Sequence, residues 1–249
     1  MSRHHICRNL VFFLALLPSI LLADTLRVAV ASNFIPVLEL LAPNFEKQSG
    51  HTLTLITGAT GQHYAQIVNG APFDVFLSAD AERPRLLEEQ GHAIADSRFT
   101  YALGKLVLWS TDPKQVDNAG AIIAAGEFKH LAIASPKLAP YGKAAQEVLM
   151  QMDVWERLQG RLVQGENITQ TLQFVYTGNA ELGFIAWAQW LEVDPGQTGS
   201  HWEVPRELYN PIVQDAVILN DSPAARAFFS FLQSDESKTL IQSAGYDLP

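Results

Sequence analysis

The segment that most restricts the fold runs from Thr57 to Asp80. A β-rich run over residues 51–57 stops at the turn Gly58-Ala59-Thr60-Gly61, and apolar residues at i, i+3 and i+4 spacing then predict a helix. A second apolar strand, Val75-Phe76-Leu77, follows this helix. Strand, turn, helix and strand form a βαβ unit, and the turn of such a unit lies at the carboxyl edge of a parallel sheet. The chain is therefore expected to be an α/β protein.

The turn before this helix is a candidate site for an anion. The first N–H groups of a helix have no partner inside it, and the helix dipole places positive charge there, so they favour a negative group. Two interpretations of Thr60 stay open, because its hydroxyl can serve a ligand or only cap its own helix. A similar arrangement at Ala31-Ser32-Asn33, where Ser32 is expected as the N-cap of the next helix, favours the anion site.

The composition argues against several kinds of partner. The chain has 249 residues, of which 48% are hydrophobic, so it is expected to be globular, with one large domain or two smaller ones. Its 17 basic residues against 26 acidic ones argue against nucleic acid and against an anionic membrane surface as partners. The same net charge repels an anionic ligand, so the attraction must come from local dipoles.

Residues 1–23 are expected to be a cleaved signal peptide. Arg3 and Arg8 give a basic start, residues 10–22 form an apolar core of signal-peptide length, and Ala23 is a small residue at the expected cleavage point. The apolar run is short for a membrane span. Cleavage also removes Cys7, the only cysteine, so the exported chain is expected to have no disulfide.

From Asp24 onward, expected strands alternate with expected helices, which predicts a doubly wound α/β protein. Besides the central unit, strands are expected at 26–31, 103–110, 131–134, 163–167 with its turn, 182–186 and 212–219. Further helices are expected at 34–50, 83–90, 117–126, 143–152, 154–158, 168–177, 223–232 and 236–244. No internal repeat or long linker is visible in the sequence.

Motifs of the common catalytic classes are absent, since there is no G-x-S-x-G elbow, P-loop, H-E-x-x-H or G-x-G-x-x-G. No two of the histidines after the signal stand at a metal-ligand spacing, so each is expected at the surface or as a cap. They are His51, His63, His92, His130 and His201. The large aromatic residues Trp187, Trp190 and Trp202 are expected in the core rather than on a ligand-stacking surface. Helix starts that follow strands remain as candidate sites: Ser32, Thr60-Gly61, Tyr141-Gly142 and Asn167-Ile168.

Four segments, together with the export signal, carry a family resemblance: 28–34 (VAVASNF), 58–61 (GATG), 69–80 (NGAPFDVFLSAD) and 181–186 (ELGFIA). They resemble the bacterial periplasmic molybdate-binding proteins, which are the substrate-binding components of ABC transporters. The resemblance covers essentially the whole chain after the signal, and the run 69–80 is its most specific part.

The resemblance implies a type II periplasmic-binding-protein fold, in which two doubly wound α/β domains enclose a ligand cleft. Two crossing strands join the domains, and their expected positions are near 101–106 and 210–216. One domain is then expected to comprise residues 24–104 plus 216–249, and the other residues 105–215.

The resemblance also implies the ligand and its contacts. Family members hold a tetrahedral oxyanion with hydroxyls and backbone N–H groups and without a counter-charge. By this resemblance Ser32 and Thr60 supply hydroxyls and N–H groups, and Tyr141 and Ile168 supply backbone N–H groups. The family often has serine in place of Thr60, and alanine and valine in place of Tyr141 and Ile168.

The same resemblance defines the expected partners. The ligand is molybdate, with tungstate as a second one, and molybdenum is held only as molybdate through the same residues. No cofactor and no enzymatic activity are expected. The protein is expected to be a periplasmic monomer that meets the membrane permease of an ABC transporter and no nucleic acid.

Ala186 departs from the family pattern. Several members place a tyrosine hydroxyl on the ligand at this position, and an alanine has no such donor. An oxyanion oxygen buried without a donor is unfavourable, so a replacement is expected. The candidates are a backbone N–H at the Ser32 or Thr60 turn, an ordered water and, less favoured, the side chain of Asn33.

Two alternative functions stay open. Ser32 with a histidine base would make an exported hydrolase or transferase, and this requires a histidine close in space to Ser32. A binding protein of the same fold for sulfate, phosphate or a small organic acid is the second alternative. An arginine or an aspartate pointing into the cleft would favour it, since arginine pairs with carboxylates and aspartate accepts from a protonated phosphate.

Overall fold

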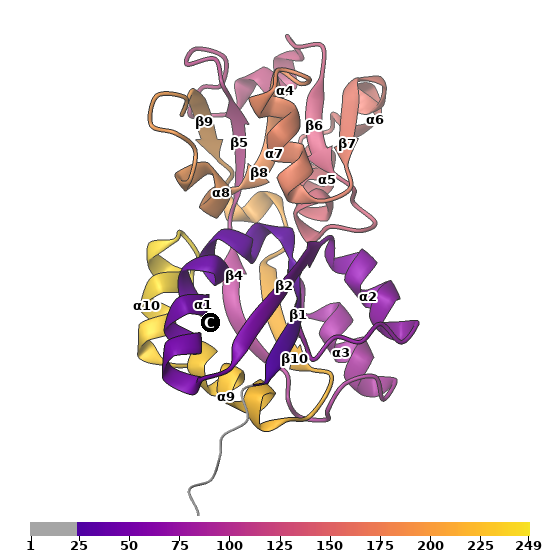
Figure 1. The fold of residues 1–249 in the computed structure, drawn as a ribbon. Coiled ribbons are helices and arrows are strands. Elements are labelled where there is room, and N and C mark those ends of the chain that lie inside the picture. Colours follow the sequence, from indigo (N-terminus) through magenta and orange to yellow (C-terminus); the bar gives the residue numbers. More distant parts are fainter. Residues whose placement is uncertain (1–23) are drawn as a thin grey trace, which may run out of the picture.

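The computed structural model describes residues 24–249, so the expected signal peptide at 1–23 lies outside the described residues. Two five-stranded sheets carry the chain, and helices flank both of them (Figure 1). We call the part built on the first sheet the first domain and the part built on the second sheet the second domain. Within residues 24–249 no helix has the length and apolar character needed to cross a membrane.

The first sheet is mixed, and β1 is parallel to both of its neighbours. Its strands, in spatial order, are β2 (Thr52–Gly58), β1 (Thr25–Ala31), β3 (Val75–Leu77), β10 (Ile212–Ile218) and β4 (Phe99–Gly104). Its helices are α1 (Ile35–Ser49), α2 (Thr60–Val68), α3 (Glu82–Glu89), α9 (Pro223–Leu232) and α10 (Asp235–Ser243). Helices α1, α9 and α10 cover one face, and α2 and α3 cover the other (Figure 1). Apolar clusters fill both interfaces, which explains why β1 is buried on both sides.

The second sheet repeats this plan. Its strands, in spatial order, are β7 (Leu162–Gly165), β6 (Leu131–Ala134), β8 (Leu182–Ala186), β5 (Leu106–Ser110) and β9 (Ser200–Glu203). Its helices are α4 (Ala121–Ala125), α5 (Pro140–Gln151), α6 (Trp155–Leu158), α7 (Ile168–Tyr176) and α8 (Trp187–Leu191). Short 3-10 turns are η1 (Ser32–Phe34), η2 (Gln159–Arg161) and η3 (Arg206–Leu208). The prediction of two doubly wound α/β units is confirmed.

The chain passes from the first sheet to the second at Lys105, inside the range 101–106 where the family resemblance implied a crossing. The single strand expected at 103–110 is in fact two strands, β4 in the first sheet and β5 in the second, with only Lys105 between them. The return crossing precedes β10, which pairs with the first sheet from Ile212 onward. The expected domain boundary at 215/216 falls inside this strand, so the domain limits remain a prediction. Strand β9 was not among the expected strands.

Two histidines are buried, contrary to the expectation that all five lie at the surface or act as caps. His63 is 2% exposed, its Nε2 lies 3.2 Å from the Val30 carbonyl oxygen, and its ring packs edge-on against Phe73 and Phe76. His51 is buried as well, and its Nδ1 accepts from the N–H of Asp24. The expectation for the tryptophans is better met: Trp202 is buried, and Trp187 and Trp190 stack together against a core cluster.

Burial sets the ionisation of His63. It lowers the pKa of the imidazole, and hydrogen bonds to Gln66 and to the Val30 carbonyl raise that pKa only in part. As the pH falls, the imidazole is therefore protonated in the unfolded chain before it is protonated in the folded one. The free energy of unfolding decreases once the pH falls below the unfolded pKa of about 6.5.

We expect acidification from about pH 7.5 to about pH 5.5 to lower the free energy of unfolding more in the wild type than in His63→Gln. The glutamine amide can still donate to the Val30 carbonyl but takes up no proton. Urea unfolding at both pH values measures the difference. An equal loss in both proteins would show that His63 does not govern this part of the pH dependence.

Candidate functional site

All four residues expected at the ligand line one small cavity between the two domains: Ser32, Thr60, Tyr141 and Ile168. Each of them is at most 5% exposed. Alanine, glycine, proline and the two asparagines Asn33 and Asn167 complete the lining, so among residues 24–249 no charged side chain lines the cavity. The structure thus brings the predicted residues together, and their role in binding stays a prediction.

Strand pairing brings the two first-domain residues together. Strands β1 and β2 are parallel neighbours, and their last paired residues are Ala31 and Gly58. Because both strands end at this level, the turns that follow them lie side by side. The turn after β1 presents Ser32, and the turn after β2 presents Thr60 at the start of α2.

The hydroxyls of these two residues differ from expectation. Ser32 is not an N-cap, because the chain enters a 3-10 turn with Ala31 in the cap position and no side-chain cap bond. Thr60 does not cap its own helix either, because Ala59 holds the cap position. The Thr60 hydroxyl oxygen accepts from the N–H of Ala79 at 3.1 Å, which leaves its own hydrogen for a ligand. The capping interpretation of Thr60 is therefore wrong.

The second domain repeats this geometry with backbone groups. Strands β6 and β7 are parallel and pair up to Ala134 and Gly165, so the starts of α5 and α7 also lie side by side. Ile168 is the first residue of α7, and its N–H therefore has no partner inside the helix. The cap bond of this helix runs instead from the N–H of Gln170 to the Asn167 side chain at 3.0 Å.

Tyr141 contributes backbone at the cavity, while its side chain is an anchor. The N–H of Tyr141 lies in the first turn of α5, directly after Pro140. Its hydroxyl lies 3.3 Å from the side-chain nitrogen of Gln214 on β10, and burial raises the pKa of the phenol well above its usual range. A Cβ at Gly104 would meet this hydroxyl at 2.3 Å, so glycine is required there.

The described lining of the cavity offers hydrogen-bond donors but no charged side chain. Residues at several helix starts of both domains line one cavity, and the first N–H groups of a helix attract an anion through their partial positive charge. In the described part of the chain, no arginine lines the cavity to pair with a carboxylate, and no aspartate or glutamate lines it to accept from a protonated phosphate. No histidine lines it either, and His63 is bonded to the Val30 carbonyl instead. Among the described lining residues there is thus no serine–histidine pair of the kind on which the hydrolase alternative depends.

Ala186 does not line the cavity. It is fully buried among apolar residues of the second domain, opposite Leu106 of β5. Among the expected replacements, the Asn33 side-chain nitrogen already donates to Gln214 at 2.9 Å and to the Tyr246 hydroxyl at 3.0 Å. Backbone N–H groups at the Ser32 and Thr60 turns remain the candidates among the described residues. The sequence alone did not predict these two hydrogen bonds of Asn33, because Gln214 and Tyr246 lie far from it along the chain.

Comparison with known proteins agrees with this geometry. The model of one family, bacterial extracellular solute-binding protein, matches residues 26–247. The chain belongs to this family. It is 49% identical over 229 residues to the molybdate-binding protein ModA of Azotobacter vinelandii, with 91% of each chain covered. It is 48% identical to the molybdate-binding protein ModA of Rhodobacter capsulatus over 221 residues, which cover 88% of this chain and 86% of the relative.

A solved structure extends the likeness to the fold. The periplasmic molybdate-binding protein of Azotobacter vinelandii superposes with a TM-score of 0.86 at 44% identity, covering 90% of this chain and 99% of that one. The type II periplasmic-binding fold and the resemblance to molybdate-binding proteins are thereby confirmed.

The hydroxyls of Ser32 and Thr60 have different hydrogen-bond partners, so removing each of them is expected to change the free energy of unfolding by a different amount. Ser32→Ala is expected to leave the free energy of unfolding nearly unchanged, because the hydroxyl makes no cap bond. Thr60→Val is expected to lower it by about 1–3 kcal/mol, because the buried N–H of Ala79 loses its acceptor. Thr60→Ser keeps the oxygen and serves as the control. Urea unfolding of the ligand-free proteins gives these values, and an equal cost for Ser32→Ala and Thr60→Val would contradict the assignment.

Proposed function

We propose that this protein binds molybdate in the periplasm and delivers it to the membrane permease of an ABC transporter. The observation that carries the proposal is a cavity without charged lining residues, lined by Ser32 and Thr60 and by helix starts of both domains. The relatives named as molybdate-binding proteins, at 49% and 48% identity, support the same ligand. Ser32 and Thr60 bind the anion through hydroxyls and N–H groups, and Tyr141 and Ile168 bind it through N–H groups.

Hydrogen bonds replace a counter-charge in this proposal. A hydrogen bond to a charged acceptor contributes roughly 1.5–3 kcal/mol, and several of them converge on the four oxygens of one ion. Closure of the domains excludes water, which strengthens each bond by lowering the local dielectric constant. The chain as a whole is acidic, with a formal net charge of −9, so these fixed dipoles act against a repulsive background.

The lining selects among anions. Without a carboxylate in its lining, the cavity has no carboxylate oxygen to accept the proton of a protonated phosphate. Without an arginine, it has no guanidinium to pair with the carboxylate of an organic acid. Tungstate has nearly the size and charge of molybdate and is proposed as a second ligand. Binding needs no cofactor, and the metal is held only through the oxygens of the anion. The protein acts as a monomer after removal of residues 1–23.

A thermal-shift screen against molybdate, tungstate, sulfate, phosphate and chromate tests the ligand. At about 100 times its dissociation constant a ligand stabilises the fold by roughly 2.7 kcal/mol, which raises Tm by about 5–10 °C for a protein of this size. Molybdate and tungstate should give this shift, while phosphate at about 1 mM should not.

Ser32→Ala is the matched variant for this screen, because it removes a proposed ligand group at little expected cost in stability. Loss of one bond to a charged acceptor weakens binding by roughly 1.5–3 kcal/mol, so the molybdate shift should shrink at the same concentration. A larger shift with phosphate or sulfate than with molybdate would refute the proposed ligand. A full shift in Ser32→Ala would place the ligand away from Ser32.

A further inference from the structure

The run Ser78-Ala79-Asp80, the end of the most specific segment of the sequence, supplies no side chain with a polar group to the cavity. Ala79 lines the cavity, whereas Ser78 is fully buried and Asp80 lies outside the lining. The Asp80 carboxylate instead accepts from Arg83 twice, from its backbone N–H at 2.9 Å and from its guanidinium. The Ser78 hydroxyl donates to the same carboxylate at 3.1 Å. Asp80 therefore fixes and neutralises the guanidinium of Arg83.

The fixed guanidinium reaches across to the second domain. Nη2 of Arg83 donates to the carbonyl oxygen of Lys137 at 2.9 Å. Next to it, the N–H of Gly61 donates to the carbonyl oxygen of Leu138 at 2.8 Å. Both acceptors belong to the loop 135–139, which leads directly into α5 and so positions the N–H of Tyr141. Arg83 does not itself line the anion cavity.

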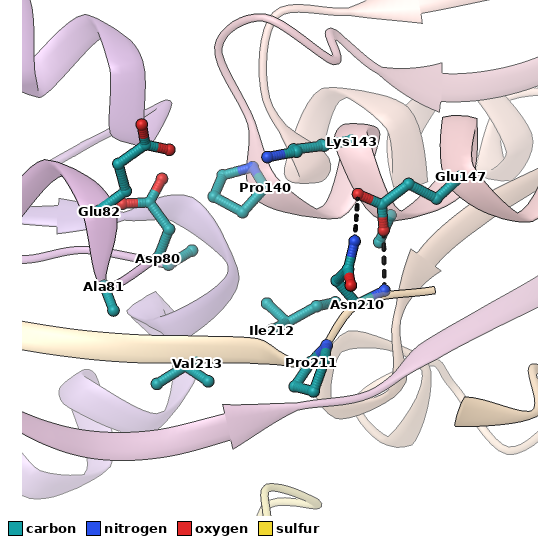
Figure 2. Close-up of a pocket in the computed structure, with 12 residues that line it drawn as sticks. Asp80, Ala81, Glu82, Pro140, Lys143, Glu147, Asn210, Pro211, Ile212 and Val213 are labelled. Carbon is teal, nitrogen blue, oxygen red and sulfur yellow. Dashed lines mark hydrogen bonds between the residues drawn. The ribbon is translucent and has the colours of Figure 1, made fainter. Parts of the chain in front are cut away.

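The two loops lie in close contact. A Cβ on Gly61 would lie 3.1 Å from Leu138 Cα and 3.2 Å from Arg83 Nη2, so a larger residue there would crowd the facing loop. An open pocket lies between the two domains beside this contact. Asp80 and Glu82 face Pro140 and Lys143 across the pocket (Figure 2). The bond from Arg83 thus bridges the two domains at the edge of this pocket.

We propose that Arg83, oriented by Asp80, is a closure latch, a positioning residue whose bond to the Lys137 carbonyl forms when the domains close over the anion. The inference rests on the proposed function, because it concerns the closed, anion-bound form. In hinge closure of a two-domain binding protein, contacts made only in the closed form slow opening without touching the ligand. The latch therefore lowers the dissociation rate of the anion and leaves the rate of association with the open form unchanged.

Arg83→Ala tests the latch, and Arg85→Ala is its matched control. Arg85 lies on the same helix and carries the same charge, but it pairs with Glu89 within the first domain. Asp80 keeps its bond to the backbone N–H of residue 83 in the alanine variant. Stopped-flow tryptophan fluorescence with molybdate gives both rate constants, and calorimetry gives Kd.

In Arg83→Ala we expect the dissociation rate and Kd to rise about tenfold, with the association rate within about threefold of wild type. The Tm of the ligand-free protein should fall only slightly, through loss of the partly exposed Asp80 ion pair, since the bond to Lys137 is absent in the open form. Arg85→Ala should change none of these values. An unchanged dissociation rate in Arg83→Ala, or a lowered Tm of its ligand-free form without faster release, would overturn the latch and leave Arg83 a purely structural residue.

The two proposals fail in different ways. Absence of heat when molybdate is added to the wild type contradicts the proposed ligand alone. The anion with the largest thermal shift then takes the place of molybdate in the same rate measurements. Wild-type binding together with wild-type release in Arg83→Ala contradicts the latch alone.

Discussion

The parallel pairing of strands up to a common last residue is the constraint on which the site depends. In the first sheet β1 and β2 end together at Ala31 and Gly58, and in the second β6 and β7 end together at Ala134 and Gly165. Each pair therefore places two helix starts side by side, and their N–H groups converge where the two domains meet. An anion can be held in such a place without a cation, because the donors are fixed before the ligand arrives.

A buried polar network connects this cavity to the strand that joins the domains. Gln214 on β10 binds the Asn33 side chain, the Tyr141 hydroxyl and the Tyr101 hydroxyl, which are drawn from both domains. Asn33 in turn lies in the cavity lining, and its carbonyl accepts from Tyr246 near the end of the chain. Burial raises the pKa of Tyr246 and of Tyr101, so these phenols stay protonated and act as donors. Gln214, on the strand that follows the return crossing, thus hydrogen-bonds to cavity-lining residues of both domains, Asn33 and Tyr141.

Local signals in the sequence were sufficient to predict residues that line one cavity, and insufficient to predict the residues that hold them in place. Ser32, Thr60 and Ile168 were found because a strand, a turn and a helix start follow one another along the chain. The residue pattern indicated one strand at 103–110 instead of two, because apolar residues continue on both sides of Lys105; only the family resemblance placed a crossing near 101–106. The partners of Thr60 and Arg83 were missed because Ala79 and Lys137 meet them only in the folded protein. His63 was misplaced since its acceptor, Val30, lies on another strand.

The most direct test of an uncharged anion site is a crystal structure of the protein with molybdate, measured at the molybdenum absorption edge. We expect one anomalous peak in the cavity, with the Ser32 and Thr60 hydroxyls and the N–H groups of Tyr141 and Ile168 within hydrogen-bond distance of the oxygens and no lysine or arginine in contact. A peak outside this cavity, or a charged side chain on the anion, would contradict the account.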